Sequence, residues 1–400
     1  MKRLVHIGVA VALCCSFLAA CAHPTRHALG DPALESTRLE RLTVLTYNIL
    51  HGLEVRGWSV GLESDEDQRI RFDLQARQLA QAQPDVMLLQ EVNPLPEKVQ
   101  AFVAALKAVG LEYTEVHQAD ACGIRLFGLR LIPGLNNGMA VLAKAPLRIR
   151  KLKGLKLSGG IGGCGEYFGL QFGELRYALI AEIDNPITGN KFLAVSLHLH
   201  AGIARTDYFI QRVTEAQQQG RIGREAMQGF VSALEQNQSR RLGEIRVLVA
   251  ELQRLLAEER DLGVILGGDF NFEPGSREYR ELMAAGLRDT HMIASPGIDL
   301  YSYDPQQNAV VRQKELTIPP SLRQALENLP EPEQQRIIED FRSGMGQARR
   351  IDYLFHMGQL PKPKACLRQA LFGEPTALSA QPGSDHYGVL NTYVLDPSQC

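Results

Sequence analysis

The sequence predicts one domain of mixed α/β structure, and three observations support this prediction. Short apolar runs of the kind found in buried strands recur between residues 42 and 394. Segments with helical apolar spacing lie between these runs. The chain has 400 residues, of which 45% are hydrophobic and 22% charged, so it can bury a sizeable core. Because strands dominate and helices lie between them, we expect a single domain over residues 41–400 rather than two domains.

The first half of this domain is expected to start with a strand and then to mix strands with helices. Apolar runs predict strands at residues 42–47, 85–92, 138–143, 177–183 and 192–200. Helical spacing predicts a helix over residues 70–83, ended by Pro84, and another over residues 99–109, ended by Gly110. Turn-forming residues at 184–190 predict a tight connection between the last two of these strands.

The second half begins with a long helical region. Residues 203–260 are rich in Gln, Glu, Arg and Leu, and they predict one or two long helices that pack through a stripe of Leu, Ile and Val. A strand is predicted over residues 262–272, a helix over residues 318–343, and closing strands at residues 351–355 and 389–394. We find no internal repeat and no low-complexity segment in the sequence.

A glycine-rich segment at residues 160–165 fits the pattern G-x-G-x-x-G, which in some proteins binds a dinucleotide. That function requires a strand before the glycines and a helix that opens within them. The residues that follow, 167–172, alternate between apolar and other residues as a strand does. We therefore predict a flexible hairpin loop here and no cofactor site.

The N-terminus carries an export signal. Lys2 and Arg3 precede an apolar run over residues 4–18, and Leu18-Ala19-Ala20-Cys21 resembles a bacterial lipobox. The resemblance implies that residues 1–20 are a signal peptide, that Cys21 carries lipid, and that residues 21–40 are a tether. An Asp after the cysteine would favour the inner membrane, and Ala22 stands there, so the outer membrane is the expected location.

Two alternatives to a lipid anchor exist for this segment. The signal could be an ordinary secretory one, in which case Cys21 would be a thiol like any other. It could also be a transmembrane helix, but the apolar run is short and Pro24 follows soon after it. The position of Cys21 directly after small residues favours the lipoprotein interpretation.

Four cysteines remain in the expected mature domain out of the 7 in the chain. Export places them in an oxidising compartment, where disulfides form. Four thiols can pair in three ways. The pairs nearest in sequence are Cys122 with Cys164 and Cys366 with Cys400, but the sequence does not decide between the pairings. None of the four has the Cys-x-x-Cys spacing of a metal site.

Polar residues cluster at the C-terminal ends of the predicted strands. Asn48, Glu91 and His198 each lie at such an end, and Asp269 and Asn271 follow an apolar strand in the same way. Strand ends direct side chains into a shared crevice, and buried strands hold them rigidly. A glutamate at such a position suits a hard cation such as Mg²⁺, which takes oxygen ligands and keeps waters for the substrate.

The order of these motifs resembles that of the endonuclease/exonuclease/phosphatase superfamily, which includes deoxyribonuclease I-like nucleases, inositol-phosphate phosphatases and neutral sphingomyelinases. Each motif alone is weakly specific, but together they follow the family order over almost the whole expected mature chain. The resemblance implies a four-layer α/β sandwich, with two central, mostly antiparallel sheets flanked by helices. The matching segments are residues 46–49, 88–92, 137–142, 196–200, 267–271, 350–353 and 384–389.

The resemblance also implies a metal site. Glu91 matches the principal metal carboxylate of the family, and Asn48 matches the polar residue beside the metal. Asp385 matches a further ligand of the metal or of its water. The expected cofactor is Mg²⁺ or Mn²⁺, and an oxygen-rich ligand set agrees with either ion.

The remaining residues match catalytic positions of the family. Asp269 and Asn271 match the pair that orients the attacking water and the phosphate oxygens. His198 matches the histidine that donates to the phosphate or the leaving group. His386 matches the general base or proton relay, and Asp352 matches the carboxylate that holds it. An imidazole beside a carboxylate is kept in one tautomer, which suits proton abstraction near neutral pH.

Three further polar residues have two interpretations. His51 and His200 lie next to site positions and are either supporting residues or ordinary polar strand ends. Asn308 lies in a Tyr303-Asp304-Pro305 context that favours a turn over a substrate contact.

The expected function is metal-dependent hydrolysis of phosphoester bonds by an activated water. Residues 196–201 are similar to the corresponding segment of neutral sphingomyelinases, and a membrane tether also fits a phospholipid or sphingolipid headgroup. A net charge of -2 shows no basic excess and counts against a bulk nucleic-acid substrate. A secreted or surface nuclease, a phosphomonoesterase and a non-catalytic, membrane-tethered binding lipoprotein remain the alternatives.

Overall fold

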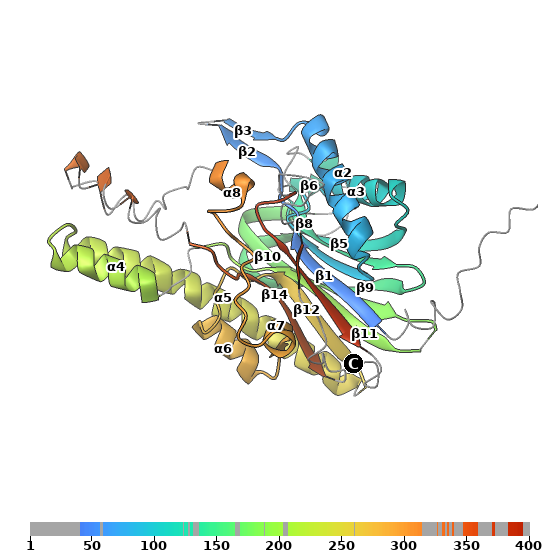
Figure 1. Cartoon of the computed structure of the whole chain (residues 1–400). Coiled ribbons are helices and arrows are strands. Elements are labelled where there is room, and N and C mark those ends of the chain that lie inside the picture. Colours follow the sequence, from blue (N-terminus) through green and yellow to red (C-terminus); the bar gives the residue numbers. More distant parts are fainter. Residues whose placement is uncertain are drawn as a thin grey trace, which may run out of the picture. The chain divides into compact units, whose positions relative to one another are not determined.

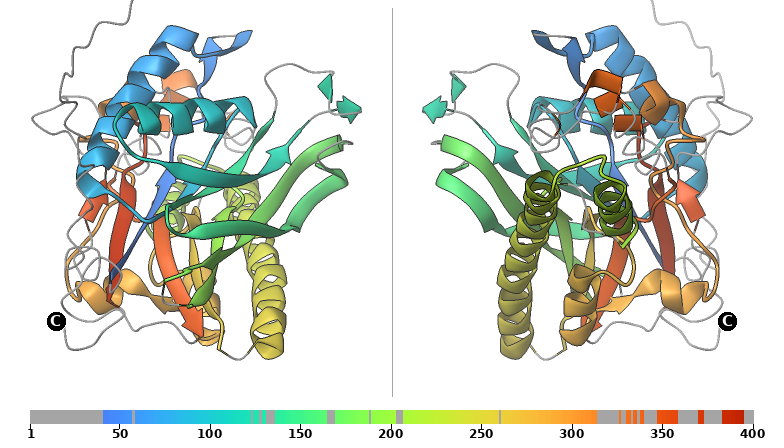
Figure 2. Two further views of the ribbon diagram at one scale, coloured as in Figure 1. Left: turned by 90° about the vertical axis from the view of Figure 1, so that its right-hand side faces the viewer. Right: turned by 90° about the vertical axis from the view of Figure 1, so that its left-hand side faces the viewer.

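Two β-sheets that pack face to face make up the centre of the protein, and helices lie on their outer faces (Figures 1 and 2). Residues 39–400 form one compact unit. The predicted signal peptide and tether, residues 1–20 and 21–40, lie outside the described residues. The computed structural model describes residues 41–394 except for residues 57–58, 123, 127–128, 131–135, 165–168, 188, 203–206, 260, 314–325, 327–329, 333, 336–337, 340–346, 359–369 and 373–382.

The first sheet has six strands in the order β15-β16-β1-β4-β8-β5. Its neighbouring strands run antiparallel except β1 and β4, which are parallel. The predicted strands at residues 42–47, 85–92, 138–143 and 389–394 are confirmed in this sheet, whereas β15 and β5 were not predicted. In sheet order, the strands span Ala370–Phe372, Gly388–Val394, Arg41–Asn48, Val86–Gln90, Asn137–Lys144 and Tyr113–Ala121.

The second sheet has eight strands, in the order β13-β14-β12-β11-β10-β6-β7, with β9 paired to β10. Its only parallel pair among the described strands is β11 with β12. A separate short ribbon pairs β2, Leu53–Arg56, with β3, Ser59–Leu62. In the order given, with β9 last, the strands span Arg288–Asp289, Asp352–Gly358, Gly263–Asp269, Lys191–His198, Gly169–Asp184, Ile124–Leu126, Leu129–Arg130 and Arg148–Cys164.

The helices complete four layers (Figures 1 and 2). Helices α2, Asp65–Ala82, and α3, Glu97–Ala108, cover the outer face of the first sheet. Helix α5, Arg224–Glu258, and helix α6, Arg277–Ala284, cover the outer face of the second. The four-layer α/β sandwich with mostly antiparallel sheets is therefore confirmed. The shorter helices are α4, α7 and α8, at Asp207–Gln218, Thr290–Ala294 and Ala309–Gln313.

Strand alternation divides the apolar residues of the second sheet between two cores. On β10, Leu179 and Ala181 join the core that lies between the sheets, whereas Ala178 and Ile180 join the core under α5 and α6. Successive side chains of a strand point to opposite faces, so a strand covered on both sides is apolar throughout. This explains why the central strands are continuous apolar runs in the sequence.

The helix predicted over residues 70–83 begins earlier, at Asp65. Ser64 caps it, because the Ser64 hydroxyl accepts a hydrogen bond from the backbone N–H of Asp67 (3.1 Å). Its first turn is acidic and exposed. Acidic residues stabilise the N-terminal end of a helix, but they carry no apolar spacing that would reveal it.

The glycine-rich segment at residues 160–165 was predicted as a hairpin loop, and this prediction is wrong in part. The hairpin exists, but residues 160–164 belong to β9, and residues 161–164 pair with β10. Gly162 has a φ of 107°, and a Cβ there would lie 1.8 Å from the carbonyl oxygen of Leu170. The glycines therefore let the two backbones approach more closely than side chains would allow.

The long helical region divides into two helices, α4 and α5, as one of the two alternatives predicted. The helix predicted over residues 318–343 lies largely outside the described residues. In the part of the chain that the structure describes, no helix is both long and apolar enough to cross a membrane.

A disulfide joins Cys122, which directly follows β5, to Cys164 at the end of β9. The two Cα atoms are 5.7 Å apart, and both residues are buried. This is one of the pairings that the sequence left open, and it links the edge of the first sheet to the second. Cys366 and Cys400 lie outside the described residues.

Gly267 on β12 provides a test of how closely the two sheets pack. A Cβ at this position would lie 2.7 Å from Leu88 Cδ1 of the first sheet and 2.8 Å from Leu354 Cδ2. We expect Gly267→Ala to lower the free energy of unfolding by about 1–3 kcal/mol, because the added methyl group overpacks a rigid core. Urea denaturation measures this change.

The matched control is Gly243→Ala on α5, where an added Cβ meets no atom within 4 Å. There the free energy of unfolding should stay the same or rise by up to about 1 kcal/mol, because alanine favours a helix. Equal effects of the two substitutions would contradict the proposed close contact at Gly267.

Candidate active site

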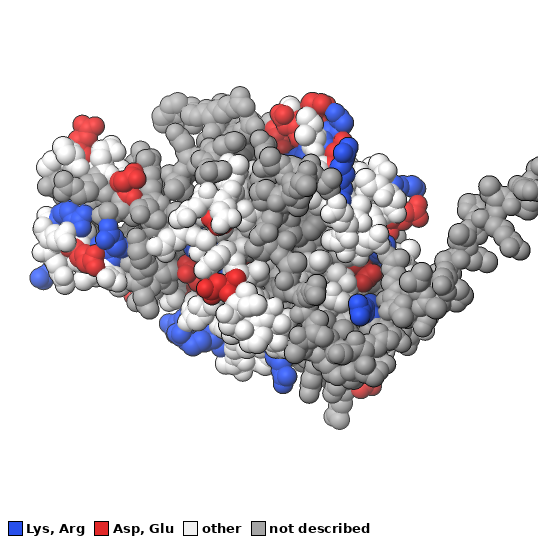
Figure 3. Space-filling model, in the orientation of Figure 1, with Lys and Arg blue, Asp and Glu red and all other residues white. Residues whose placement is uncertain are grey.

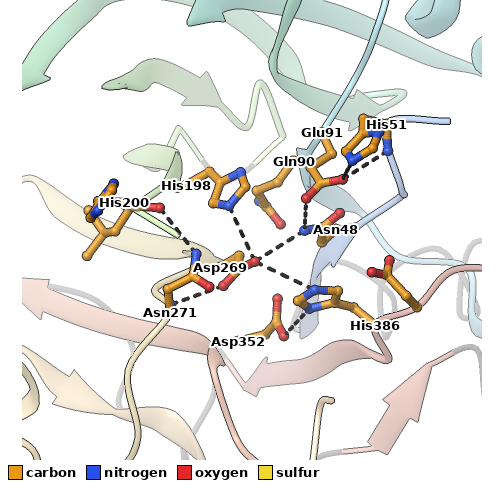
Figure 4. A network of polar contacts seen from close by, with 12 residues as sticks. Asn48, His51, Gln90, Glu91, His198, His200, Asp269, Asn271, Asp352 and His386 are labelled. Carbon is orange, nitrogen blue, oxygen red and sulfur yellow. Dashed lines mark hydrogen bonds and ion pairs between the residues drawn. The ribbon is translucent and has the colours of Figure 1, made fainter. Parts of the chain in front are cut away.

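The parallel strand pairs bring the predicted site residues to one edge of each sheet (Figure 4). In the first sheet, Asn48 at the end of β1 lies opposite Gln90 at the end of β4, and Glu91 follows directly. In the second sheet, His198 at the end of β11 lies opposite Asp269 at the end of β12. Parallel strands end at the same edge, so these side chains meet where the sheets face each other.

Asp269 is the residue on which most of the contacts converge (Figure 4). Its Oδ2 accepts a hydrogen bond from Asn48 Nδ2 (3.2 Å) and lies 3.5 Å from His198 Nε2 and 3.7 Å from His386 Nε2. Its Oδ1 accepts a hydrogen bond from the backbone N–H of Asn271 (3.0 Å). The side chain is 2% exposed, so these polar contacts replace water.

Glu91 holds the first-sheet side of the site. Its carboxylate accepts hydrogen bonds from Asn48 Nδ2 (3.0 Å) and from the backbone N–H of His51 (2.9 Å). Asn48 therefore bridges the carboxylates of Glu91 and Asp269. Glu91 has a φ of 57° and Asn271 a φ of 53°, in the left-handed region that non-glycine residues rarely adopt. Such conformations cluster at functional sites, where the surrounding structure enforces them.

His386 is held by Asp352. The Nδ1 atom of His386 lies 2.8 Å from Asp352 Oδ2, which directs Nε2 toward Asp269. Asp352 lies opposite Asp269 in the antiparallel pairing of β14 with β12. Its backbone N–H donates to Ser302 Oγ (2.9 Å), and the ring of Tyr303 contacts the imidazole edge to face. The predicted link between Asp352 and His386 is thus present.

Charges within the crevice shift the pKa values of its residues. Burial lowers the pKa of His386, but the carboxylates of Asp352, Asp269 and Asp385 raise it by more, so the net shift is upward. Burial also raises the pKa of Asp269, against the charge of His386. Both shifts follow from several carboxylates confined in one buried space, which favours retention of a proton.

The pKa of His198 shifts in the opposite direction from that of His386. Burial, with the positive charge of Arg176 nearby, lowers the pKa of His198 to about 3, so its imidazole is neutral at physiological pH. Its Nδ1 atom is buried and has no hydrogen-bond partner among the described residues. A buried polar atom without a partner is uncommon in native proteins and fits a position that a ligand completes.

Two groups of side chains could hold a metal ion. The ligand atoms of Glu91, His198 and Asp269 lie within 4.8 Å of one another, and those of Asp269, Asp352 and His386 do so as well. Carboxylate oxygens with an imidazole nitrogen suit Mg²⁺ or Mn²⁺. The residues present therefore fit a divalent cation between Glu91 and Asp269.

Two predicted metal residues differ from simple ligands. Asn48 turns its Nδ2 group toward the carboxylates, whereas its Oδ1 accepts a hydrogen bond from the backbone N–H of Leu50 (3.2 Å). Asp385 is buried beside His386 and accepts a hydrogen bond from Ser384 Oγ (3.2 Å). Within the described residues, neither ligand group includes it.

His51, His200 and Asn308, which each had two interpretations, make different contacts in the structure. His51 lies beside Glu91, with its Nε2 at 3.7 Å from the carboxylate. The ring of His200 instead contacts Glu174 (3.0 Å) and Asn237 (3.0 Å). Asn308 is fully buried and donates to the carbonyl oxygen of Ser384 (3.0 Å), so its contact is within the protein.

Sequence reasoning missed the supporting residues Gln90, Ser196 and Arg176. Gln90 Nε2 donates to Ser196 Oγ (3.0 Å), and Ser196 Oγ donates to the carbonyl oxygen of Leu89 (3.0 Å), so hydrogen bonds connect the sheets beneath the site. Arg176 is buried between Glu174 and Asp120, at 2.5 Å and 3.9 Å. The only sequence signal was that each is a polar residue within an apolar run.

Comparison with known proteins agrees with this architecture. The model of the Endonuclease/Exonuclease/phosphatase family matches residues 45–386. Among curated proteins, none matches the sequence. The fold is similar to that of an endonuclease/exonuclease/phosphatase family protein from Bacteroides thetaiotaomicron, with 17% identity, a TM-score of 0.53, and coverage of 90% of this chain and 96% of that one.

A second similar structure is truncated TDP2 from Caenorhabditis elegans. It has 16% identity and a TM-score of 0.50, and the match covers 88% of this chain and 98% of that one. At such low identity these likenesses show the fold alone, whereas the family match extends over most of the chain. The chain therefore belongs to the Endonuclease/Exonuclease/phosphatase family, and is a hydrolase of the nuclease and phosphatase type with residues suited to bind a metal.

Proposed function

We propose that this protein is a phosphodiesterase that uses Mg²⁺ or Mn²⁺ and a water molecule to hydrolyse its substrate. The observation that carries the proposal is the arrangement around Asp269. Its carboxylate lies within 3.7 Å of atoms of Asn48, His198 and His386, at the edge where the two sheets meet. One phosphate group could therefore contact three kinds of group here. These are the Asp269–His386 pair for proton transfer, hydrogen-bond donors such as His198, and two carboxylates for a cation.

Glu91 and Asp269 are the residues that would hold the cation, with Asn48 fixing the distance between their carboxylates. A bound divalent cation supplies positive charge that offsets these carboxylates and polarises the phosphate oxygens. Two hydrogen bonds hold Asn271 in place. Its backbone N–H donates to Asp269 Oδ1, and its Nδ2 donates to the carbonyl oxygen of Leu199 (3.2 Å). It borders the space where the water would be oriented.

The water oxygen forms a bond to phosphorus as the bond from phosphorus to the leaving oxygen breaks. The leaving oxygen departs with the electron pair of that bond and takes up a proton from solvent, and the proton of the attacking water passes to the pair formed by Asp269 and His386. Asp352 keeps His386 in one orientation and stabilises its protonated form. His198 is neutral, so it donates a hydrogen bond to the phosphate rather than a proton. Together these contacts favour the transition state, in which negative charge builds up on the phosphate.

The proposed substrate class is a phosphodiester in a phospholipid or sphingolipid headgroup. The similarity of residues 196–201 to neutral sphingomyelinases supports this class, and so does the net charge of -2. On the face seen in Figure 3, acidic and basic side chains are interspersed among the described residues. A protein that binds long nucleic acids usually has a clear basic excess instead.

We further propose that the protein is exported and anchored to the cell envelope through lipid on Cys21, in the outer membrane. The lipobox-like segment and Ala22 support this location. A lipid tether would hold the enzyme close to a membrane substrate.

The first prediction concerns activity. The chain should hydrolyse bis-(p-nitrophenyl) phosphate in the presence of Mg²⁺ or Mn²⁺, and a chelator should abolish turnover. Hydrolysis of sphingomyelin or phosphatidylcholine should exceed cleavage of plasmid DNA. His386→Ala should lower kcat by about 10²–10⁴-fold, because it removes one member of the Asp269–His386 pair that takes up the proton of the water. Faster cleavage of DNA would identify a nuclease, and no turnover with any metal would favour a binding lipoprotein.

The second prediction concerns Asp352. Asp352→Asn should lower kcat by about 10²–10⁴-fold, because the amide no longer fixes the tautomer of His386 or stabilises its charge. Circular dichroism should show an unchanged fold. Asp73→Asn, at a half-exposed position on α2, is the control and should retain full activity. Wild-type kcat in Asp352→Asn would remove His386 from the proposed mechanism.

The third prediction concerns the anchor. Metabolic labelling with a radioactive fatty acid should label the wild-type protein but not Cys21→Ser. Fractionation should place the wild type in the outer membrane, and Ala22→Asp should move it to the inner membrane. Label on Cys21→Ser would disprove lipidation at this residue.

A further inference from the structure

A group of charged side chains, largely shielded from solvent, lies under the loop at residues 49–52, outside the site itself. It consists of Glu63, which precedes α2, Arg71 on α2 and Lys98 on α3. The Lys98 side chain is 0% exposed, and its Nζ lies 3.4 Å from Glu63 Oε1. Arg71 also pairs with Glu63. Two cations thus share one carboxylate in the interior.

These charged residues hold the backbone of the loop. Lys98 Nζ donates to the carbonyl oxygen of Leu50 (2.9 Å), and Arg71 donates to that of Ile49 (2.5 Å). The backbone N–H of Glu63 donates to the carbonyl oxygen of Gly52 (2.7 Å). Three of the four carbonyl groups in the loop are therefore fixed by this group.

The loop needs such restraint. Leu50 has a φ of 69°, in the left-handed region, which a non-glycine residue keeps only where the surrounding structure enforces it. The same loop presents the backbone N–H of His51 to Glu91 Oε2, at 2.9 Å. The position of the Glu91 carboxylate thus depends on the conformation of the loop.

The buried charges have no evident benefit for stability alone. Removing a cation from water costs several kcal/mol, and well-packed apolar residues often replace buried ion pairs without loss. Burial, together with the charge of Arg71, lowers the pKa of Lys98 to about 7, so Glu63 does not fully offset this cost. The hydrogen bonds to the loop give these cations a different role.

We propose that Lys98 is a positioning residue for Glu91. Together with Arg71 it locks the loop at residues 49–52, and the loop in turn holds the Glu91 carboxylate through His51 N–H. The consequence for metal binding rests on the proposed function, in which Glu91 holds the cation. The effect of Lys98 on the loop itself does not depend on the proposed function.

Two measurements on the full chain test this role, with Lys98→Met as the variant. Hydrogen–deuterium exchange without metal should be about tenfold faster at residues 49–52 than in the wild type, because the loop opens more easily. Titration with Mn²⁺, followed by electron paramagnetic resonance, should give a dissociation constant raised about 10–100-fold. At saturating Mn²⁺, kcat should be restored, which a general loss of structure would not allow.

Lys107→Met is the matched control, because Lys107 lies on the same helix but its side chain is 72% exposed. It should change neither exchange nor Mn²⁺ affinity. If Lys98→Met does not fold, Gly52→Ala disturbs the loop without removing a charge, because Gly52 has a φ of 70° and an added Cβ would meet the Glu63 side chain. It should show the same two effects.

Unchanged exchange at residues 49–52 in the folded variants would overturn the proposal, as would an unchanged Mn²⁺ dissociation constant despite faster exchange. If the wild type binds no Mn²⁺ at all, the proposed function fails. Faster exchange in Lys98→Met, with Lys107→Met unchanged, would then still support the role of Lys98 in holding the loop.

Discussion

Burial of the Asp269 carboxylate between the two sheets is the constraint on which the site depends. An ionised carboxylate loses several kcal/mol of hydration when it is buried, so the surrounding chain must supply polar contacts in place of water. Asn48 provides one, the backbone of Asn271 another, and His386 a positive charge. Each comes from a different part of the sequence. The fold has to bring these segments to one point before Asp269 can remain buried.

The sheets achieve this through their two parallel strand pairs. Each sheet is antiparallel elsewhere along its described strands, yet β1 with β4 and β11 with β12 run in the same direction. A parallel pair ends at one edge, so it delivers two site segments together. Gly267 then allows the sheets to approach, and the Gln90–Ser196 hydrogen bond aligns them beneath the site. Packing between the sheets therefore sets the distances between residues such as Asn48 and Asp269.

The sequence could predict the parts of this arrangement that depend on local patterns. Apolar runs gave the central strands, and the motif order indicated the four-layer fold and the gathering of Glu91, Asp269 and His386. Features that depend on contacts between residues far apart in the sequence could not be predicted. The direction in which His200 turns depends on Glu174 and Asn237, which lie 26 and 37 residues away. The acidic start of α2 and the glycines of β9 also follow from contacts that apolar spacing does not record.

The distribution of charge explains why the crevice suits a cation. Arg71 and Lys98 lie behind the loop at residues 49–52, and their donors are engaged by Glu63 and backbone carbonyl groups. Arg176 is likewise paired with Glu174. These cations support the walls of the site but do not neutralise Glu91 and Asp269 directly. The carboxylates of Glu91 and Asp352 thus remain near Asp269, and after burial their charges are the next causes that raise the pKa of Asp269. A divalent cation bound between Glu91 and Asp269 would offset their negative charge. An arginine in the same place would also offset it, but its side chain would fill the space that the proposed substrate needs.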